Sequence, residues 1–280
     1  MSPERLGQHF LADTRWRERI AHAIFGLGAF SPEAAQAKAG GLWIEIGAGH
    51  GEMTTLLAQH ANQVIAIEID DRLLAPLRES SASAGNVAVV SGDVLEIDLA
   101  GLAERTDLGG APGARFRVYG NLPYYISSPI IHRLLGGRGR LDSAFIVVQR
   151  EVAERMAATP GHREYGYFSA FTQFYSRPEI VFRIPPGAFR PPPQVDSALV
   201  ALRIPGERSR LQIDDDMAFM RFLKICFAHK RKTLRNNLLA LWPSTDLQEN
   251  FRIAGIPAGA RAEQLTLAEL ALLFTVGRTR

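Results

Sequence analysis

Residues 42–55 read LWIEIGAGHGEMTT, and this stretch decides the fold. Its first five residues, Leu42–Ile46, form a short and mostly apolar run that predicts a buried strand. Gly47, Gly49 and Gly51 follow, and a helical pattern begins directly after them. Glycines at a strand-to-helix turn let the backbone come close to a ligand and present amide groups at the helix N-terminus. Such turns are common, so this one indicates a ligand without identifying it.

The same order, a short apolar strand and then a helix, repeats along the chain to about Ala157. Short, nearly continuous apolar strands that alternate with helices are typical of a parallel sheet with helices on both faces. We therefore expect an α/β fold with a Rossmann-like sheet. The expected strands are Leu42–Ile46, Val64–Ile67, Val87–Val90, Phe116–Tyr119 and Ala144–Val148. The expected helices are Thr14–Gly26, Glu52–Gln59, Arg72–Ser80, Pro129–Leu135 and Glu151–Ala157, with Ser31–Gly41 as a short helix or a loop.

The pattern changes after Tyr167. FTQFYSRPEIVFRI (171–184) and VDSALVALRI (195–204) are typical of two further strands, joined by the proline-rich PPGAFRPPPQ without a helix between them. Such a pair should be antiparallel and close one edge of the sheet. From Asp214 onward only helical patterns remain. We expect two domains, residues 1–205 and a small all-helical domain of residues 206–280.

The composition of the 280 residues, 46% hydrophobic and 22% charged, is that of an ordinary globular protein. No run approaches the ~18 apolar residues of a membrane span, and the first residues lack the apolar core of a signal peptide. A single cysteine, Cys226, excludes an internal disulfide framework and fits a reducing cytosol. It also argues against a cysteine-rich metal site, and no other metal-ligand spacing is present. We expect a cytoplasmic, monomeric protein that binds no metal.

Basic residues are concentrated toward the C-terminus. The net charge is only +3, but residues 206–280 hold 12 Lys and Arg against 8 Asp and Glu. Within them, FAHKRKTLRNNLL (227–239) places Lys230, Arg231, Lys232 and Arg235, beside His229, within two turns of a predicted helix. Arg231 and Arg235 are four residues apart and share a helix face. Non-specific contact with nucleic-acid phosphates is one use of such a cluster, and a solvated helix face is the other.

Acidic residues follow the next two expected strands. Glu68 lies ~20 residues beyond the glycine turn, where a carboxylate can accept both hydroxyls of a ribose, and Asp93 can accept from an adenine amino group. Either residue alone could be a helix cap or a surface acid. Since ligands of parallel sheets lie at the carboxyl ends of the strands, the glycine turn and these acids together predict an adenosine-shaped site. Glu52 stands where a dinucleotide fingerprint has glycine or alanine, so S-adenosylmethionine is a better candidate than a nicotinamide cofactor.

The fourth expected strand ends in Asn121-Leu122-Pro123-Tyr124. This pattern resembles the Asn/Asp-x-Pro-Tyr/Phe catalytic motif of methyltransferases that act on exocyclic amino groups of nucleobases. Longer stretches extend the resemblance over nearly the whole chain: GQHFL (7–11), IEIGAGHG (44–51), GNLPYYISSPI (120–130), QREVAERM (149–156) and PPGAFRPPPQVDSALV (185–200). Together they resemble the small-subunit ribosomal RNA adenine N6-dimethyltransferases of the kasugamycin-resistance type. The related macrolide-resistance methylases of large-subunit RNA match the last stretch and the C-terminal helices less well.

This resemblance implies a class I methyltransferase fold with S-adenosylmethionine as methyl donor. The implied substrate is a pair of neighbouring adenines near the 3′ end of small-subunit ribosomal RNA, and the implied partner is the small ribosomal subunit or its precursor. It also favours RNA contact for the C-terminal basic cluster. By the same resemblance, the residues that contact the cofactor are His9, Leu11, Gly47, Gly49, Glu68, Asp93 and Asn121. Many relatives have asparagine where His9 stands.

The residue types of the motif suit the chemistry of an adenine amino nitrogen, whose lone pair is delocalised into the ring. The Asn121 side chain and the Leu122 backbone supply two carbonyl acceptors, which can hold both amino hydrogens and free the lone pair for in-line transfer. Pro123 stiffens the turn because its φ is fixed. Tyr124 offers a face on which an extruded base can stack, an interaction worth ~1–3 kcal/mol.

Two further aromatic residues are assigned differently. Phe189 lies in a loop held by prolines, and the resemblance implies that its ring covers the other face of the base; packing in the core is the alternative. Tyr125 stands where many relatives have asparagine. We expect it to form a wall or to pack, and we assign it no catalytic role.

Three other functions are compatible with a similar fold. A DNA adenine methyltransferase is disfavoured because the chain is short and shows no DNA-recognition domain. A non-catalytic ribosome-assembly or RNA-binding factor is disfavoured by the intact Asn121–Tyr124 motif, although a binding role can accompany catalysis. A dehydrogenase is disfavoured by Glu52.

Overall fold

The computed structural model describes residues 9–26, 40–137 and 139–278. The chain divides into two units, Met1–Ala153 with Glu179–Ile204, and Glu154–Pro178 with Pro205–Arg280. These units differ from the expected division into residues 1–205 and 206–280 in one segment, since Glu154–Pro178 groups with the C-terminal residues. The expected helix or loop at Ser31–Gly41 lies outside the described residues except for its last two positions.

A mostly parallel sheet forms the centre of the first unit, as predicted. Within the described residues it has seven strands in the order β4-β3-β2-β5-β6-β9-β7. The neighbours from β4 to β6 are parallel, whereas β9 is antiparallel to β6. The strands are β2 (Leu42–Ile46), β3 (Gln63–Glu68), β4 (Val87–Ser91), β5 (Phe116–Asn121), β6 (Leu141–Gln149), β7 (Arg177–Ile184) and β9 (Ser197–Arg203).

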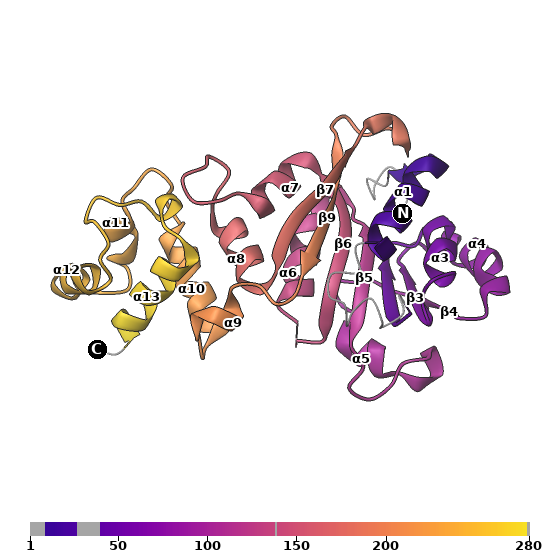
Figure 1. Ribbon diagram of the computed structural model, residues 1–280, viewed down its shortest axis with the longest axis horizontal. Coiled ribbons are helices and arrows are strands. Elements are labelled where there is room, and N and C mark those ends of the chain that lie inside the picture. Colours follow the sequence, from indigo (N-terminus) through magenta and orange to yellow (C-terminus); the bar gives the residue numbers. More distant parts are fainter. Residues whose placement is uncertain (1–8, 27–39, 138, 279–280) are drawn as a thin grey trace. The chain divides into compact units, whose positions relative to one another are not determined.

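Helices cover both faces of this sheet (Figure 1). They place apolar stripes against it: in α6 (Ser127–Leu135), Ile130, Ile131 and Leu134 are buried, at the spacing expected for one helix face. Figure 1 shows α6 on the opposite side of the sheet from α1, α3 and α4. The remaining helices of the alternating region are α1 (Thr14–Gly26), α3 (Glu52–Ala58), α4 (Asp71–Ser81), α5 (Leu99–Glu104) and α7 (Arg150–Ala157).

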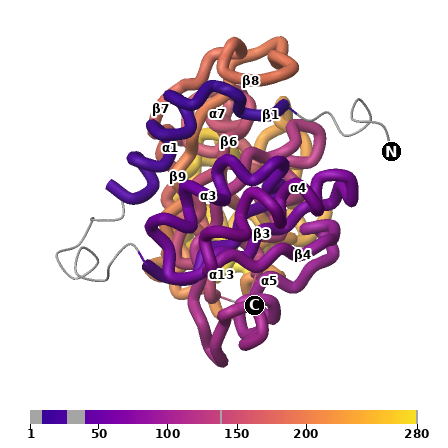
Figure 2. Tube along the Cα trace, turned by 90° about the vertical axis from the view of Figure 1, so that its right-hand side faces the viewer, coloured from indigo at the N-terminus to yellow at the C-terminus, as the bar shows by residue number. Residues whose placement is uncertain are grey.

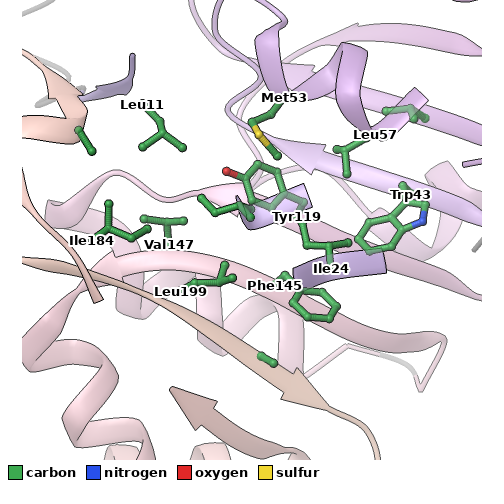
Figure 3. Packing of buried hydrophobic residues seen from close by; sticks show 14 of the residues in the cluster. Leu11, Ile24, Trp43, Met53, Leu57, Tyr119, Phe145, Val147, Ile184 and Leu199 are labelled. Atoms are coloured by element: carbon green, nitrogen blue, oxygen red, sulfur yellow. The ribbon is translucent and has the colours of Figure 1, made fainter. Parts of the chain in front are cut away.

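The main apolar core lies between the sheet and helices α1 and α3. Trp43 of β2 and Tyr119 of β5 are each 1% exposed, and Figure 3 shows Met53 and Leu57 of α3 packed above them. Burying an apolar side chain fully contributes about 1.5–3 kcal/mol, so this layer holds β2 and β5 firmly in place. The loops that follow these two strands are therefore mounted on a rigid base.

The order of the strands reverses between β2 and β5. The chain runs outward from β2 to β3 and β4 and then returns to β5 on the other side of β2, with Ile46 opposite Gly120. Ligands of open α/β sheets bind at such a switch point, outside the carboxyl ends of the strands. The topology thus brings the glycine turn after β2 and the Asn121–Tyr124 motif after β5 to the same place.

Two short strands join the N-terminal segment to the proline-rich segment. β1 (Phe10–Leu11) pairs antiparallel with β8 (Phe189–Arg190), with Leu11 opposite Phe189. Figure 2 shows them side by side, although they are far apart in the sequence. His9 Nδ1 also donates to the carbonyl oxygen of Pro191 at 2.8 Å. The N-terminal segment is therefore held at the sheet edge where the two motifs meet.

One predicted strand is wrong in its first half. Residues 171–175 belong to α8 (Tyr167–Tyr175), and β7 begins only at Arg177. Aromatic residues favour strands in general, but Phe168, Phe171 and Phe174 recur at helical spacing and are buried together. The helix cannot continue far, because Pro178 disfavours helical backbone at the residue before it.

The second unit is helical. Phe219 is central to its packing, since its ring centroid lies 5.2 Å from the rings of both Phe174 and Phe274. No helix among the described residues is long and apolar enough to cross a membrane. After α8, the unit contains α9 (Arg208–Leu211), α10 (Asp216–Cys226), α11 (Leu234–Leu238), α12 (Ser244–Ile253) and α13 (Leu267–Arg278).

Candidate active site

The glycine turn after β2 adopts backbone φ angles that favour glycine. The φ angle is +59° at Gly49 and +91° at Gly51, in the left-handed region that other residues rarely adopt. A Cβ atom on Gly49 would lie only 3.2 Å from the ring of Phe10. Glycine at position 49 therefore serves both the turn and the close approach of the N-terminal segment.

Glu68, at the end of β3, holds this turn in place. Its side chain is 2% exposed, and its Oε2 accepts from the Gly49 amide at 2.8 Å. Its Oε1 accepts from the amides of Ile69 and Asp70, each at 2.9 Å. An ionised carboxylate offers about four lone-pair sites, so Glu68 retains acceptor capacity toward the pocket that it lines.

A pocket, here called the Asn121 pocket, lies where these segments meet. Its walls come from the N-terminal segment, the glycine turn, the end of β3 and the motif after β5. The lining residues are His9, Phe10, Gly47, Glu68, Asn121, Leu122, Pro123 and Tyr124. The structure therefore brings together predicted positions that are distant in sequence, from His9 to Tyr124.

The motif presents two carbonyl oxygens at this pocket. The Asn121 Nδ2 donates to the carbonyl oxygen of His9 at 2.8 Å, which leaves Oδ1 as the acceptor of the carboxamide. The Leu122 amide donates to Val147 O at 3.0 Å, and no described group donates to the Leu122 carbonyl oxygen. Both oxygens can therefore accept from a ligand.

The rest of the motif is held by local hydrogen bonds. Pro123 has a φ of −57°, and its carbonyl oxygen accepts from Ser127 Oγ at 2.9 Å. The Tyr124 hydroxyl is hydrogen-bonded to Ser197 Oγ, and the Tyr124 ring centroid lies 5.2 Å from the ring of His9. Burial raises the pKa of the Tyr124 hydroxyl, so this ring stays a neutral phenol in a fixed orientation.

A second pocket, the Asp93 pocket, adjoins the first, because Gly47 and Pro123 line both. Asp93 follows β4, and its Oδ1 accepts from the Leu95 amide at 2.8 Å. Most of the remaining wall is apolar and includes Ile69 and Val94. The predicted acidic residues thus lie at two successive strand ends, Glu68 in one pocket and Asp93 in the next.

Two predicted site residues lie in the core cluster. Leu11 is buried in the core cluster, and Phe10 lines the Asn121 pocket instead, because successive residues of a strand point to opposite faces. Phe189 is 0% exposed in the same cluster and lines neither pocket. The structure shows core packing for Phe189, the alternative that the sequence left open.

Sequence reasoning missed several residues of the two pockets. Phe10 could have been found from strand alternation once its neighbour Leu11 was assigned to the core. Ile69 and Val94 directly follow the predicted acids Glu68 and Asp93, so their positions at strand ends were a signal. Tyr125, which the sequence analysis expected to form a wall or to pack, lines the Asp93 pocket.

A buried acid that the sequence did not single out lies beneath the glycine turn. Glu45 of β2 is 2% exposed, and burial raises its pKa to about 8. Its Oε2 and the hydroxyl of Tyr119 have no hydrogen-bond partner within the described part of the chain. No His, Cys, Asp and Glu side chains there are grouped so that they could hold a metal ion.

The basic cluster is a turn, not the predicted helix. Helix α10 ends at Cys226, and α11 begins only at Leu234, with Thr233 as its cap accepting from the Asn236 amide. The Asn237 Nδ2 donates to the carbonyl oxygen of Cys226 at 2.7 Å, which satisfies one of the carbonyl groups left free at the end of α10.

The predicted common helix face of Arg231 and Arg235 is therefore wrong. His229, Lys230, Arg231 and Lys232 are exposed in the turn, and Arg235 is half-buried and donates to Ser244 Oγ at 2.6 Å. Lys230 Nζ donates to the carbonyl oxygen of Arg163. Neither Arg231 nor Lys232 has an acidic partner among the residues that the structure describes.

Comparison with known families matches residues 3–277 to the profile of the ribosomal RNA adenine dimethylases. Two relatives named ribosomal RNA small subunit methyltransferase A are similar over nearly their full lengths. The one from Acidobacterium capsulatum is 40% identical over 271 residues, which cover 96% of this chain and 89% of the relative. The one from Koribacter versatilis is 38% identical over 275 residues, which cover 96% and 92%.

Solved structures show the same fold. A dimethyladenosine transferase from Plasmodium falciparum superposes with a TM-score of 0.76 at 25% identity, covering 95% of this chain and 96% of that one. The 23S rRNA methyltransferase ErmE superposes with a TM-score of 0.67, also at 25% identity, and the two coverages are 95% and 98%.

Proposed function

The chain belongs to the ribosomal RNA adenine dimethylase family, and we propose on this basis that it dimethylates two adjacent adenines near the 3′ end of small-subunit ribosomal RNA. The methyl groups go to the N6 amino nitrogens, the donor is S-adenosylmethionine, and the partner is the small ribosomal subunit or its precursor in the cytoplasm. One observation carries the proposal: two carbonyl oxygens, Asn121 Oδ1 and Leu122 O, are available at a pocket that adjoins two carboxylates.

The residues of the two pockets fit an adenosine-containing methyl donor. When bound, the donor supplies an electrophilic methyl group on a sulfonium. Glu68 has acceptor capacity left for the ribose hydroxyls, and Asp93 can accept from an adenine amino group. The glycine turn lets the backbone come close to the remainder of the donor. His9 adds its backbone carbonyl to fix Asn121, so its side chain need not match that of its relatives.

Asn121 and Leu122 act on the substrate amino group. In the first transfer their carbonyl oxygens each accept one N6 hydrogen, which draws the nitrogen toward a pyramidal geometry and localises its lone pair. In the second transfer N6 carries one hydrogen, and one of the two oxygens accepts it. Because these acceptors are fixed before the substrate arrives, they cost no reorganisation during the reaction. The amino nitrogen loses a proton after transfer, and no strong base is needed at this site.

Pro123 and Tyr124 keep the substrate in place. The hydrogen bond from Ser127 and the fixed φ of Pro123 hold the turn that carries both acceptors. The Tyr124 ring, tied by its hydroxyl to Ser197, is a platform on which the extruded adenine can stack.

The exposed turn of His229–Lys232 is the proposed contact for RNA phosphates, with Arg235 beside it. A turn can present several cations to a backbone of phosphates without a common helix face. The four residues of this proposed contact are Lys230, Arg231, Lys232 and Arg235.

The test is methyl transfer from radiolabelled S-adenosylmethionine to unmethylated small subunits, with large-subunit RNA and duplex DNA as alternative substrates. We expect label in N6,N6-dimethyladenine of the small subunit. Label in large-subunit RNA or in DNA, or none at all, would contradict the proposal.

Asn121→Ala separates binding from chemistry. By analogy with the removal of a single preorganised hydrogen-bonding group from an active site, we expect transfer to fall about 10²–10³-fold. Binding of S-adenosylhomocysteine should remain measurable by calorimetry. If Asn121→Ala retained most of its transfer activity, the amino-group mechanism would be wrong.

A further inference from the structure

Two large apolar side chains that line the Asp93 pocket are exposed. Ile69, directly after β3, is 49% exposed, and Tyr125, in the 3₁₀ turn Tyr124–Ile126 after β5, is 59% exposed. Both line the same pocket. Exposed single hydrophobic residues are ordinary on protein surfaces, but two large ones at the rim of one pocket offer their apolar surface to a ligand there.

Tyr125 is not needed to hold the motif together. Among the residues that the structure describes, no ring packs against its ring and no group bonds to its hydroxyl. Tyr124, by contrast, is half-buried, has its ring centroid 5.2 Å from that of His9 and is hydrogen-bonded to Ser197. A side chain of this size, with no ring contact and no hydrogen bond in the described part of the chain, has more than half of its surface available for a ligand.

The local backbone explains why two neighbouring tyrosines serve different pockets. Successive residues of a 3₁₀ helix are about 120° apart around its axis, since there are three residues per turn. Tyr124 therefore faces the Asn121 pocket, and Tyr125 faces the Asp93 pocket. The turn thus assigns one aromatic ring to each pocket.

The chemistry of the Asp93 pocket fits a flat heteroaromatic ring with an amino group at its edge. Ile69, Val94 and Ile126 supply apolar contacts for the faces of such a ring. Asp93 uses Oδ1 for the Leu95 amide, and its Oδ2 accepts from no group in the described part of the chain, so it is available for an exocyclic amine. An adenine has this combination of apolar faces and an amino edge.

We infer that Tyr125 is a binding residue for the adenine of the methyl donor, with its ring packed on the base and its hydroxyl left in solvent. This inference rests on the proposed use of S-adenosylmethionine. It assigns the two tyrosines of the motif to two different adenines: Tyr124 stacks on the substrate base, and Tyr125 packs on the donor. Tyr125 increases the affinity for the donor and contacts no reacting atom.

Calorimetric titration of the full chain with S-adenosylhomocysteine tests this assignment. Because alanine in place of a stacking aromatic weakens base binding by about 1–3 kcal/mol, Tyr125→Ala should weaken binding roughly 5- to 150-fold. Tyr125→Phe keeps the ring and should bind like the unaltered protein. Met217→Ala, at another large exposed apolar side chain (68% exposed), is the control and should not change the affinity.

Two further measurements distinguish direct binding of the donor from a structural effect. In methyl transfer, Tyr125→Ala should raise the KM for S-adenosylmethionine and leave kcat at saturating donor unchanged. The affinity for 5′-methylthioadenosine, which keeps the adenine and lacks the amino-acid end, should fall by the same factor as the affinity for S-adenosylhomocysteine.

Several outcomes would overturn the inference. If Tyr125→Ala bound S-adenosylhomocysteine as tightly as the unaltered protein, or if Tyr125→Phe bound it as weakly as Tyr125→Ala, the ring would not touch the donor. If the affinity fell only for S-adenosylhomocysteine, and not for 5′-methylthioadenosine, the ring would touch the amino-acid end. If the unaltered protein bound neither ligand, the proposed donor itself would be wrong.

Discussion

Glu45 is a carboxylic acid placed inside the apolar layer that supports the site. It is 2% exposed, and burial, with smaller contributions from the negative charges of Glu52 and Glu68, raises its pKa from an ordinary value of 4.5 to about 8. At neutral pH the folded protein therefore keeps this group mostly protonated, whereas the unfolded chain ionises it. A neutral carboxyl also avoids the cost of a buried, unpaired charge.

This difference predicts that the free energy of unfolding falls as the pH rises. Below pH 4.5 both states hold the proton, and the contribution of Glu45 is fully present. It decreases progressively as the pH rises toward and through 8, by at most about 1.4 kcal/mol for each pH unit.

Urea unfolding of Glu45→Gln at pH 6, 7, 8 and 9 is the measurement. We expect the stability of this variant to fall less than that of the unaltered protein over that range, because its amide does not ionise. Glu79→Gln, which changes an exposed carboxylate, is the control and should follow the unaltered protein. Equal slopes for Glu45→Gln and the unaltered protein would show that Glu45 is already ionised in the folded state.

At the scale of elements, the β1–β8 pair decides which aromatic residues the site can use. Leu11 and Phe189 face each other in this pair and are both buried, so Phe10 and His9 are left to line the Asn121 pocket. The ring of Phe189 contributes to the core beneath the site, and its effect on activity should follow its effect on stability.

Phe189→Ala should therefore lower the free energy of unfolding by about 3–5 kcal/mol, the usual cost of deleting a buried phenylalanine. Phe189→Leu keeps most of the buried volume and should retain both most of the stability and most of the kcat. Denaturant unfolding and methyl-transfer rates on the same samples distinguish the two roles. A Phe189→Leu variant with normal stability and little activity would favour stacking on the base.

The basic turn between α10 and α11 makes a prediction about salt dependence. Arg231→Ala/Lys232→Ala should weaken binding of small-subunit RNA and flatten the plot of log affinity against log salt concentration by about 0.7–0.9 for each phosphate that is no longer neutralised. Arg210→Ala/Arg252→Ala removes the same charge from two exposed arginines that already have glutamate partners, and it should change the slope less. Equal effects of the two double variants would mean that net charge, and not this turn, governs RNA binding.

At the scale of the whole molecule, the second unit is discontinuous in sequence. Residues 154–178 leave the sheet after β6, contribute α8 to the helical unit and return to the sheet as β7. The ring of Phe174 in α8 packs against Phe219 in α10. We propose that a domain boundary placed only at residue 205 would split this functional unit into two parts.

A chain ended after residue 205 should therefore expose the buried side of α8. We expect it to bind a hydrophobic dye and to self-associate in size-exclusion chromatography. A matched chain that also replaces residues 154–178 with a flexible linker removes the whole second unit and should show less of both. A monomeric chain of residues 1–205 without dye binding would mean that α8 folds without the C-terminal helices.

Much of the fold could be predicted from the sequence, because it depends on interactions between residues that are close together in the chain. Apolar runs of strand length, glycines at a turn and helical stripes specify most of the β–α steps, and the strands and helices predicted from Leu42 to Gln149 match the structure to within a few residues. Helix α5 (Leu99–Glu104) was not predicted. The Asn121–Tyr124 motif and its neighbours were identifiable for a related reason: their residue types fit the proposed chemistry on an amino group and can be identified without knowledge of distant contacts.

Tertiary structure alone decided which side chains reach the pockets. Residues 171–175 contain aromatics that suit a strand or a helix, and packing within the second unit selected the helix. Phe189 was suited to cover a base or to fill the core, and its pairing with Leu11 across β1–β8 selected the core. Tyr125 lines a pocket only because the order of the strands places the ends of β3 and β4 beside the turn that contains Tyr125. A local sequence pattern shows which environments suit a residue. Whether the residue is buried depends on partners that are distant in the chain, and only the folded molecule brings these together.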